Sequence, residues 1–188
     1  LVERVILNFM QQMSGIATLS RALVDAVEGT GCKILDTRKT TPGMRAIEKW
    51  AVRIGGGMNL RFGLFDMMMI KDNHADFAGG IPQAIARALD HQQKHGMSIP
   101  IEVETRNLAE VRQVLKAGGV QRIMLDNYST AELRKAVQLI AGKFETEASG
   151  GITLETVRAY AECGVDVISV GALTHSATSL DMSLKAMG

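Results

Sequence analysis

Short apolar segments alternate with segments of helical periodicity along most of this chain, and that alternation limits the folds open to it. The segments expected to form strands are residues 33–35, 67–70, 99–103, 122–125, 143–147 and 167–170. The segments expected to form helices are residues 44–54, 81–95, 108–117, 130–141 and 154–162, with leading helices in residues 1–30. Strands separated by single helices favour parallel pairing with right-handed crossovers. The order of segments therefore predicts an α/β fold with one parallel sheet.

Signals at the segment boundaries support this division. Typical N-cap residues precede helical segments at Asn107, Ser129 and Thr153, glycines follow them at Gly96, Gly118 and Gly164, and Pro42 and Pro82 lie near helix starts. Polar residues follow nearly every strand, and barrel enzymes build their sites at that edge. We therefore expect residues 1–188 to form a six-stranded parallel (β/α) barrel. It would be TIM-like but incomplete, because eight units are usual.

Composition excludes several classes of protein. The 188 residues carry 21 Lys and Arg against 20 Asp and Glu, a net charge of +1, which argues against nucleic acid or a membrane surface as partner. The longest uncharged run, residues 5–20, is too short and too polar to span a bilayer, and no basic segment precedes it. The two cysteines have no metal-site spacing and favour a reduced, cytoplasmic location. The chain has no initiator Met, so we expect it to be part of a longer protein.

Basic residues concentrate locally, between residues 36 and 74, although the whole chain is almost neutral. The cations there are Arg38, Lys39, Arg45, Arg61 and Lys71. Arginine forks suit carboxylates and phosphates, and lysine adds a point charge. The cluster predicts a site for a small, multiply charged anion, and the alternative is a solvated polar loop.

Two features in the same stretch are weaker indications of function. Gly55, Gly56 and Gly57 allow close approach and positive φ, but they follow a helix and match neither a Walker loop nor the dinucleotide fingerprint. His74 is a candidate base, although a single histidine is more often structural.

Carboxylates follow the next strands. Glu102 and Glu104 lie on one face of their strand because strand side chains alternate, and Asp126 ends the following strand. Carboxylates opposite cations can bind sugar hydroxyls or hold Mg²⁺ that arrives with phosphates. The alternative is an internal salt bridge to the same lysines and arginines.

Small residues end the last two strands. They are Ser149, Gly150, Gly151, Gly171 and Ala172. Such residues expose backbone N–H groups that can hold a phosphate, and barrels often place phosphate sites in their last two βα loops.

With these residues in place, the chain resembles the quinolinate phosphoribosyltransferase family, also called nicotinate-nucleotide pyrophosphorylases (carboxylating). The matching stretches are L-N-F-M-Q-Q-M-S-G-I-A-T, L-D-T-R-K-T-T-P-G-M-R, G-G-G-M-N-L-R-F-G-L-F-D, I-K-D-N-H, I-E-V-E, M-L-D-N, A-S-G-G-I and V-G-A-L-T-H-S. They occur in family order from end to end of the chain, and this combination is far more specific than any one piece.

The resemblance implies an activity and an architecture. The family transfers the 5-phosphoribosyl group of phosphoribosyl pyrophosphate to quinolinate, releasing pyrophosphate and CO₂ and forming nicotinate mononucleotide for NAD synthesis. Mg²⁺ accompanies the pyrophosphate, and no organic cofactor is expected. Members form dimers or assemblies of dimers. Each subunit has an amino-terminal α/β sandwich and a six-stranded barrel, and this chain matches the barrel alone.

The resemblance also assigns residues. Substrate-binding positions are Thr37, Arg38, Lys39, Arg61, Lys71, Glu104, Asp126, Ser149, Gly150, Gly151, Gly171 and Ala172. Among them the catalytic positions are Lys39, Lys71, Glu104 and Asp126, and the positions expected to hold Mg²⁺ are Glu104 and Asp126.

Two departures from the family pattern have consequences. Leu60 stands where the family usually has His, which removes a polar group beside the substrate carboxylate. The missing sandwich normally covers the open side of the barrel, so we expect a folded but incomplete site with an exposed apolar patch. Two other functions stay open: a phosphoribosyltransferase for nicotinate or another heteroaromatic acid, and a silent paralogue that only binds phosphosugar.

Overall fold

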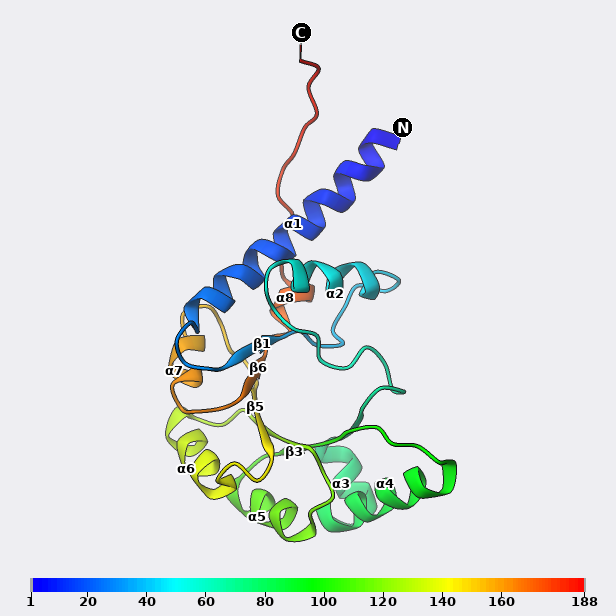
Figure 1. Cartoon of the computed structure of the whole chain (residues 1–188), viewed down its shortest axis with the longest axis vertical. Coiled ribbons are helices and arrows are strands. Elements are labelled where there is room, and N and C mark those ends of the chain that lie inside the picture. The colour runs from blue at the N-terminus through cyan, green and yellow to red at the C-terminus, as the bar shows by residue number, and fades with distance from the viewer. Residues whose placement is uncertain (1, 188) are drawn as a thin grey trace.

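The computed structural model describes residues 2–187, and within this range six strands form one parallel sheet with the order β1-β6-β5-β4-β3-β2. The strands are β1 (Lys33–Leu35), β2 (Met68–Ile70), β3 (Ile101–Thr105), β4 (Arg122–Asp126), β5 (Glu145–Ser149) and β6 (Val167–Ser169). Every pair is parallel, as predicted. The sheet curves, and its two edge strands, β1 and β2, do not pair with each other (Figure 1). The barrel is therefore open between β1 and β2.

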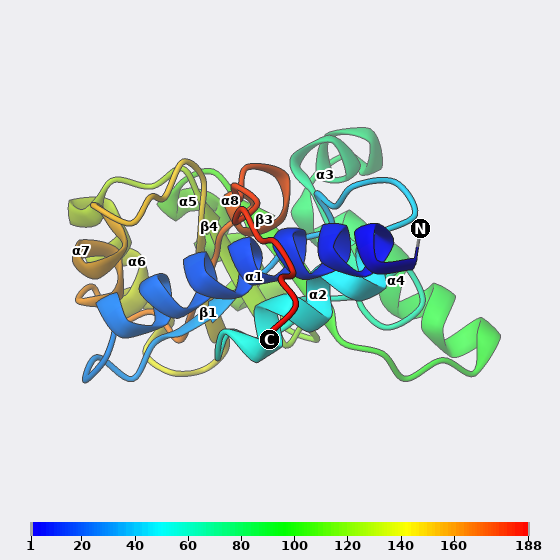
Figure 2. The same cartoon turned by 90° about the horizontal axis from the view of Figure 1, so that it is seen from above.

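Helices connect the strands and cover the outer face of the sheet (Figure 1). They are α1 (Val2–Ala26), α2 (Arg45–Ile54), α3 (Asp72–Ala78), α4 (Ile81–His95), α5 (Leu108–Ala117), α6 (Thr130–Ile140), α7 (Val157–Ala161) and α8 (Ala172–His175). The leading segment is one continuous helix, where several were expected. Seen from above, α1 crosses the body with the C-terminal segment beside it (Figure 2). The contact includes a 3.1 Å hydrogen bond from Leu180 N–H to the Gln11 carbonyl.

Several boundaries differ from the predictions for local reasons. β3 begins two residues late because Pro100 has no N–H to donate to a neighbouring strand. Thr153 is not an N-cap, since a turn occupies residues 154–156 and α7 begins at Val157. Asn107 and Ser129 are N-caps as predicted, and their side chains accept hydrogen bonds from Glu110 N–H and Glu132 N–H. The short helices α3 and α8 were not predicted.

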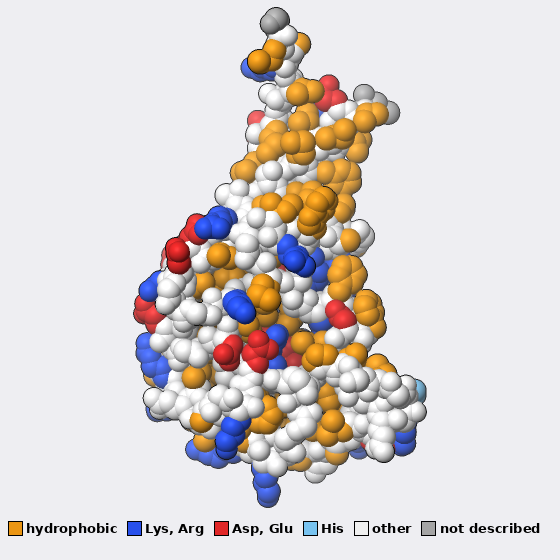
Figure 3. All heavy atoms as spheres, viewed as in Figure 1, with side chains coloured by type: hydrophobic (Ala, Val, Ile, Leu, Met, Phe, Trp, Pro, Cys, Tyr) orange, Lys and Arg blue, Asp and Glu red, His pale blue; other side chains and the backbone are white. Residues whose placement is uncertain are grey.

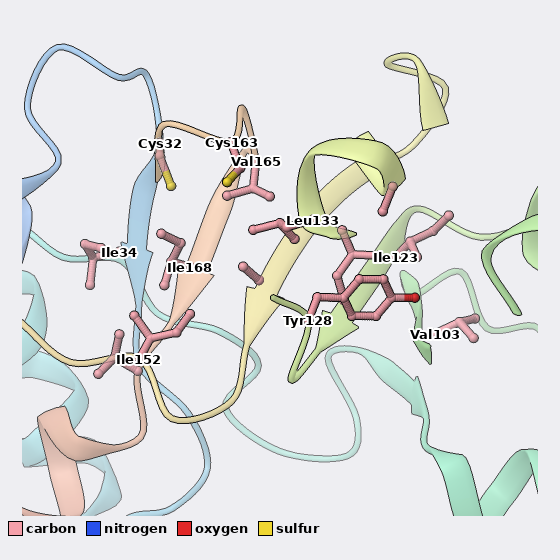
Figure 4. Close-up of a cluster of buried hydrophobic side chains, with 14 of the residues drawn as sticks. Cys32, Ile34, Val103, Ile123, Tyr128, Leu133, Ile152, Cys163, Val165 and Ile168 are labelled. Carbon is pink, nitrogen blue, oxygen red and sulfur yellow. The ribbon is translucent and has the colours of Figure 1, made fainter. Parts of the chain in front are cut away.

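The main apolar core lies between the strands and the outer helices. Ile123 on β4, Ile168 on β6 and Leu133 on α6 are fully buried there (Figure 4). On β4 and β6 the residues next to Ile123 and Ile168 face the barrel interior instead. Their paired neighbours on β3 and β5 are the buried acids Glu102 and Glu147. The apolar core therefore fixes which strand residues face the interior.

Apolar side chains are also exposed on the surface of the described residues. Val5, Ile6 and Met10 on α1 are each about half exposed, and Phe65 and Phe77 are more so. Figure 3 shows such side chains gathered where α1 projects from the body. Among residues 2–187, no helix is long and apolar enough to cross a membrane.

Candidate active site

A cavity of about 780 Å³ opens at the carboxyl ends of the strands. Every predicted substrate-binding position lines it: Thr37, Arg38, Lys39, Arg61, Lys71, Glu104, Asp126, Ser149, Gly150, Gly151, Gly171 and Ala172. They come from loops and strand ends spread over the whole chain. The fold thus gathers the predicted residues into one place.

One wall of the cavity is cationic. Arg38, Lys39 and Arg61 line it, and within residues 2–187 none of the three forms an ion pair with a carboxylate. The Nε atom of Arg38 is buried and has no hydrogen-bond partner in the same range. Burial lowers the pKa of Arg61, and the neighbouring Arg38 lowers it further. Uncompensated, partly buried cations fit a site whose counter-ion is a ligand.

The other predicted cation, Arg45, has a different place. Its Nε donates to Thr40 Oγ1 at 3.1 Å and its Nη1 donates to the Phe62 carbonyl at 3.1 Å. Arg45 does not line the cavity. It therefore joins two loops beside the site instead of binding the anion.

The facing wall is acidic. Glu104 at the end of β3 and Asp126 at the end of β4 both line the cavity. Burial raises the pKa of Glu104, Asp126 raises it further, and Lys71 opposes the shift from 4.0 Å away. Two neighbouring carboxylates suit a divalent cation or sugar hydroxyls. No group of three or more metal-ligating side chains occurs among residues 2–187, so a bound cation would take further ligands from its substrate or from water.

Glu102 lies below the cavity, in the barrel interior. Its side chain is fully buried, and both carboxyl oxygens lack a hydrogen-bond partner within residues 2–187. The nearby arginine, Arg122, donates instead to Glu147 Oε2 at 3.0 Å. Burial and then the Glu147 carboxylate raise the pKa of Glu102 well above its ordinary value. The strand face predicted for Glu102 is confirmed, but the alternative of a direct salt bridge is wrong.

The remaining wall consists of small residues. Gly150 and Gly151 have φ values of +99° and +59°, in the left-handed region that favours glycine. A Cβ atom on Gly150 would lie 2.2 Å from Asn127 Oδ1, so a side chain does not fit there. Successive glycines of this kind leave backbone N–H groups open to an anion.

Sequence reasoning missed some cavity residues and overvalued one. Asn127 and His175 line the cavity but were not predicted as site residues. Their motifs, M-L-D-N and V-G-A-L-T-H-S, contain the only sequence signal for them. His74 lies outside this cavity, and its Nδ1 accepts the Lys71 N–H at 3.1 Å at the start of α3. The structural interpretation of His74 is therefore favoured.

Comparison with known proteins shows to which family the chain belongs. Residues 16–185 match the family model described as quinolinate phosphoribosyl transferase, C-terminal domain. The chain belongs to the quinolinate phosphoribosyl transferase family. This confirms the resemblance drawn from the motifs.

Individual members of the quinolinate phosphoribosyl transferase family are close to the chain. It is 53% identical to the chloroplastic nicotinate-nucleotide pyrophosphorylase [carboxylating] of Arabidopsis thaliana, over 97% of the chain and 56% of that relative. It is 48% identical to the probable nicotinate-nucleotide pyrophosphorylase [carboxylating] of Bacillus subtilis, over 97% of the chain and 62% of that relative. The structure of NadC from Streptococcus pyogenes superposes with a TM-score of 0.91 at 45% identity, covering 98% of the chain and 63% of NadC. The chain thus spans between 56% and 63% of the length of these relatives.

Proposed function

We propose that the protein carrying this chain transfers a phosphoribosyl group from phosphoribosyl pyrophosphate to quinolinate, with decarboxylation, to give nicotinate mononucleotide for NAD synthesis. The observation that carries the proposal is the uncompensated cationic wall, in which Arg38 Nε is buried without a partner. Quinolinate is a planar dicarboxylate, and arginine forks and lysines suit its two carboxylates. The name of one relative adds support, because a protein of Nicotiana tabacum that is 51% identical to the chain is named quinolinate phosphoribosyltransferase [decarboxylating].

The opposite walls suit the phosphoribosyl donor. Glu104 and Asp126 would bind the ribose hydroxyls, and the small residues Ser149, Gly150 and Gly151 would hold the 5-phosphate. The same two carboxylates fit Mg²⁺, which takes one or two carboxylates and completes its shell from phosphate and water. Mg²⁺ would supply charge neutralisation for the pyrophosphate. Nothing in the proposed reaction needs an organic cofactor.

The chain's own residues would act by positioning and by charge. The bond between ribose C1 and the pyrophosphate oxygen breaks as the quinolinate ring nitrogen forms its bond to C1. Lys39 and Lys71, which both line the cavity, would balance the negative charge that develops on the leaving pyrophosphate and the charge that the acceptor carboxylates carry. The C2 carboxylate then leaves as CO₂, its bonding electrons stay on C2 as a carbanion stabilised by the adjacent cationic ring nitrogen, and a proton from water adds to that carbon. Holding both substrates in one cavity removes much of the entropic barrier.

Assembly and location belong to the same proposal. The open gap between β1 and β2 and the exposed apolar side chains of α1 support a homodimer, or an assembly of dimers, in which further protein covers these surfaces. The free cysteines Cys32 and Cys163 are compatible with a cytoplasmic enzyme.

A second acceptor is favoured by one observation. Leu60 lines the cavity and is 7% exposed, packed with Leu35 and Val167. An apolar side chain beside the cationic wall suits an acceptor with fewer polar groups at that edge, such as nicotinate.

Acceptor competition in the intact protein tests the proposal. Pyrophosphate release is measured with phosphoribosyl pyrophosphate, Mg²⁺ and either quinolinate or nicotinate. Faster release with quinolinate supports the main proposal, and faster release with nicotinate supports the alternative. If the protein binds phosphoribosyl pyrophosphate but releases no pyrophosphate with either acceptor, it only binds phosphosugar.

A further inference from the structure

A buried acid lies directly behind the cationic wall. Asp36 follows β1, is completely buried and is not part of the cavity lining. Its carboxylate accepts hydrogen bonds from Asn59 Nδ2 at 2.5 Å, from Leu60 N–H at 3.0 Å and from Lys49 Nζ. The donors come from α2 and from the loop that follows it. Asp36 therefore links this loop to the end of β1.

Lys49 and Asn59 extend the same network. Lys49 Nζ, on a side chain only 3% exposed, also donates to the Leu60 carbonyl at 3.2 Å. Asn59 Nδ2 also donates to the Lys49 carbonyl at 2.9 Å. Both backbone groups of Leu60 are therefore held by buried charged side chains. Two residues before Leu60, Met58 pairs with β1 through a hydrogen bond from its N–H to the Ile34 carbonyl at 2.8 Å.

The residues that this network holds lie in the cavity. Leu60 and Arg61 line it from the loop, and Thr37 and Arg38 line it from the segment directly after Asp36. A buried ion pair is a weak source of stability, because hydrophobic replacements are often as stable. The Asp36–Lys49 ion pair also hydrogen-bonds the loop after α2, and these hydrogen bonds fix the position of that loop. Asp36, Lys49 and Asn59 themselves do not line the cavity.

We propose that Asp36, Lys49 and Asn59 are positioning residues that hold Leu60 and Arg61 against the acceptor and so set acceptor affinity. This inference rests on the proposed function, since it takes the acceptor to be a heteroaromatic acid bound at the cationic wall. Small displacements of binding groups have large effects on such sites. The donor contacts at Ser149, Gly150 and Gly151 come from another part of the chain and stay in place.

Two variants of the intact protein and one control test the proposal. Asn59→Ala removes two hydrogen bonds and leaves the ion pair, Lys49→Met removes the ion pair, and Arg53→Ala on the exposed side of α2 is the control. Hydrogen exchange of residues 57–61 is followed by mass spectrometry. Dissociation constants for quinolinate and for phosphoribosyl pyrophosphate are measured separately by calorimetry. We expect faster exchange, a rise of roughly tenfold or more in the quinolinate constant, and little change in the donor constant.

The outcomes separate this inference from the proposed function. Unchanged exchange in Asn59→Ala, or an equal loss of both ligands, would overturn the positioning role. If Lys49→Met does not fold, Asn59→Ala decides, because its ion pair is intact. If the unaltered protein binds the donor but not quinolinate, the proposed function has failed, and the exchange data still decide whether the network holds residues 60 and 61.

Discussion

Replacing Glu102 with Gln is expected to stabilise the protein above neutral pH. Glu102 and Glu147 are both fully buried in the barrel interior, and the partly buried Arg122 donates hydrogen bonds to Glu147 and to the more exposed Glu145. Arg122 thus pairs with Glu147, and Glu102 is left without a hydrogen-bonded cation among residues 2–187. A second buried charge without a close partner costs several kcal/mol, so Glu102 keeps its proton instead.

The sign of the pH dependence follows from the raised pKa of Glu102. Above its ordinary pKa of 4.5, the unfolded chain releases the proton while the folded protein retains it. The free energy of unfolding therefore falls as pH rises from about that value through the folded pKa, by about 1.4 kcal/mol per pH unit. Glutamine mimics the protonated acid, so Glu102→Gln removes this fall in the free energy of unfolding with rising pH. The advantage of Glu102→Gln should grow by about 1.4 kcal/mol for each pH unit within that window.

Urea denaturation of the intact protein at pH 5, 6, 7 and 8 measures this directly. The matched control is Glu145→Gln, which removes a carboxylate that pairs with the same arginine but is 44% exposed. It should change stability by no more than about 1 kcal/mol and leave the slope with pH unaltered. A loss of about 3–5 kcal/mol in Glu102→Gln at pH 7 would refute the reasoning, because it would show that Glu102 is ionised and paired.

Three further predictions concern the cavity and the core. Arg38→Ala should weaken quinolinate binding by about 2 kcal/mol or more, measured by calorimetry, with donor binding retained; unaltered quinolinate affinity would remove Arg38 from the acceptor site. Gly150→Ala should abolish measurable donor binding in a folded protein, since its Cβ would lie 2.2 Å from Asn127 Oδ1; normal affinity would show that this loop does not hold the phosphate. Leu133→Ala, at a fully buried core position, should lower the free energy of unfolding by about 2–5 kcal/mol in urea, and a change below about 1 kcal/mol would contradict the packing described.

The sequence predicted the parts of this protein that depend on local patterns. Strand and helix order followed from apolar periodicity. Positions such as Arg38, Glu104 and Asp126 could be assigned to one cavity because parallel strands bring their carboxyl ends to the same edge. The helix α3 was missed because its polar start, Lys71 to His74, looks like a loop until His74 caps the Lys71 N–H.

Side-chain partnerships across the chain could not be predicted in the same way. Nothing in the spacing of Asp36, Lys49 and Asn59 indicates that they meet, since the contact depends on how α2 and the loop after it lie against the residue that follows β1. The placing of Arg45 and the pairing of Arg122 with Glu147 are also tertiary choices among several nearby charges. Such choices are decided by burial and geometry, which one sequence does not contain.

The measurement that tests the central claim most directly follows one carbon atom. The intact protein is incubated with phosphoribosyl pyrophosphate, Mg²⁺ and quinolinate labelled in its C2 carboxylate, and labelled CO₂ and pyrophosphate are both quantified. We predict that the two appear in equal amounts, and that Arg61→Ala and Lys71→Ala reduce both together. Pyrophosphate without labelled CO₂, or neither product at substrate concentrations that saturate binding, would contradict the assignment of this cavity to quinolinate.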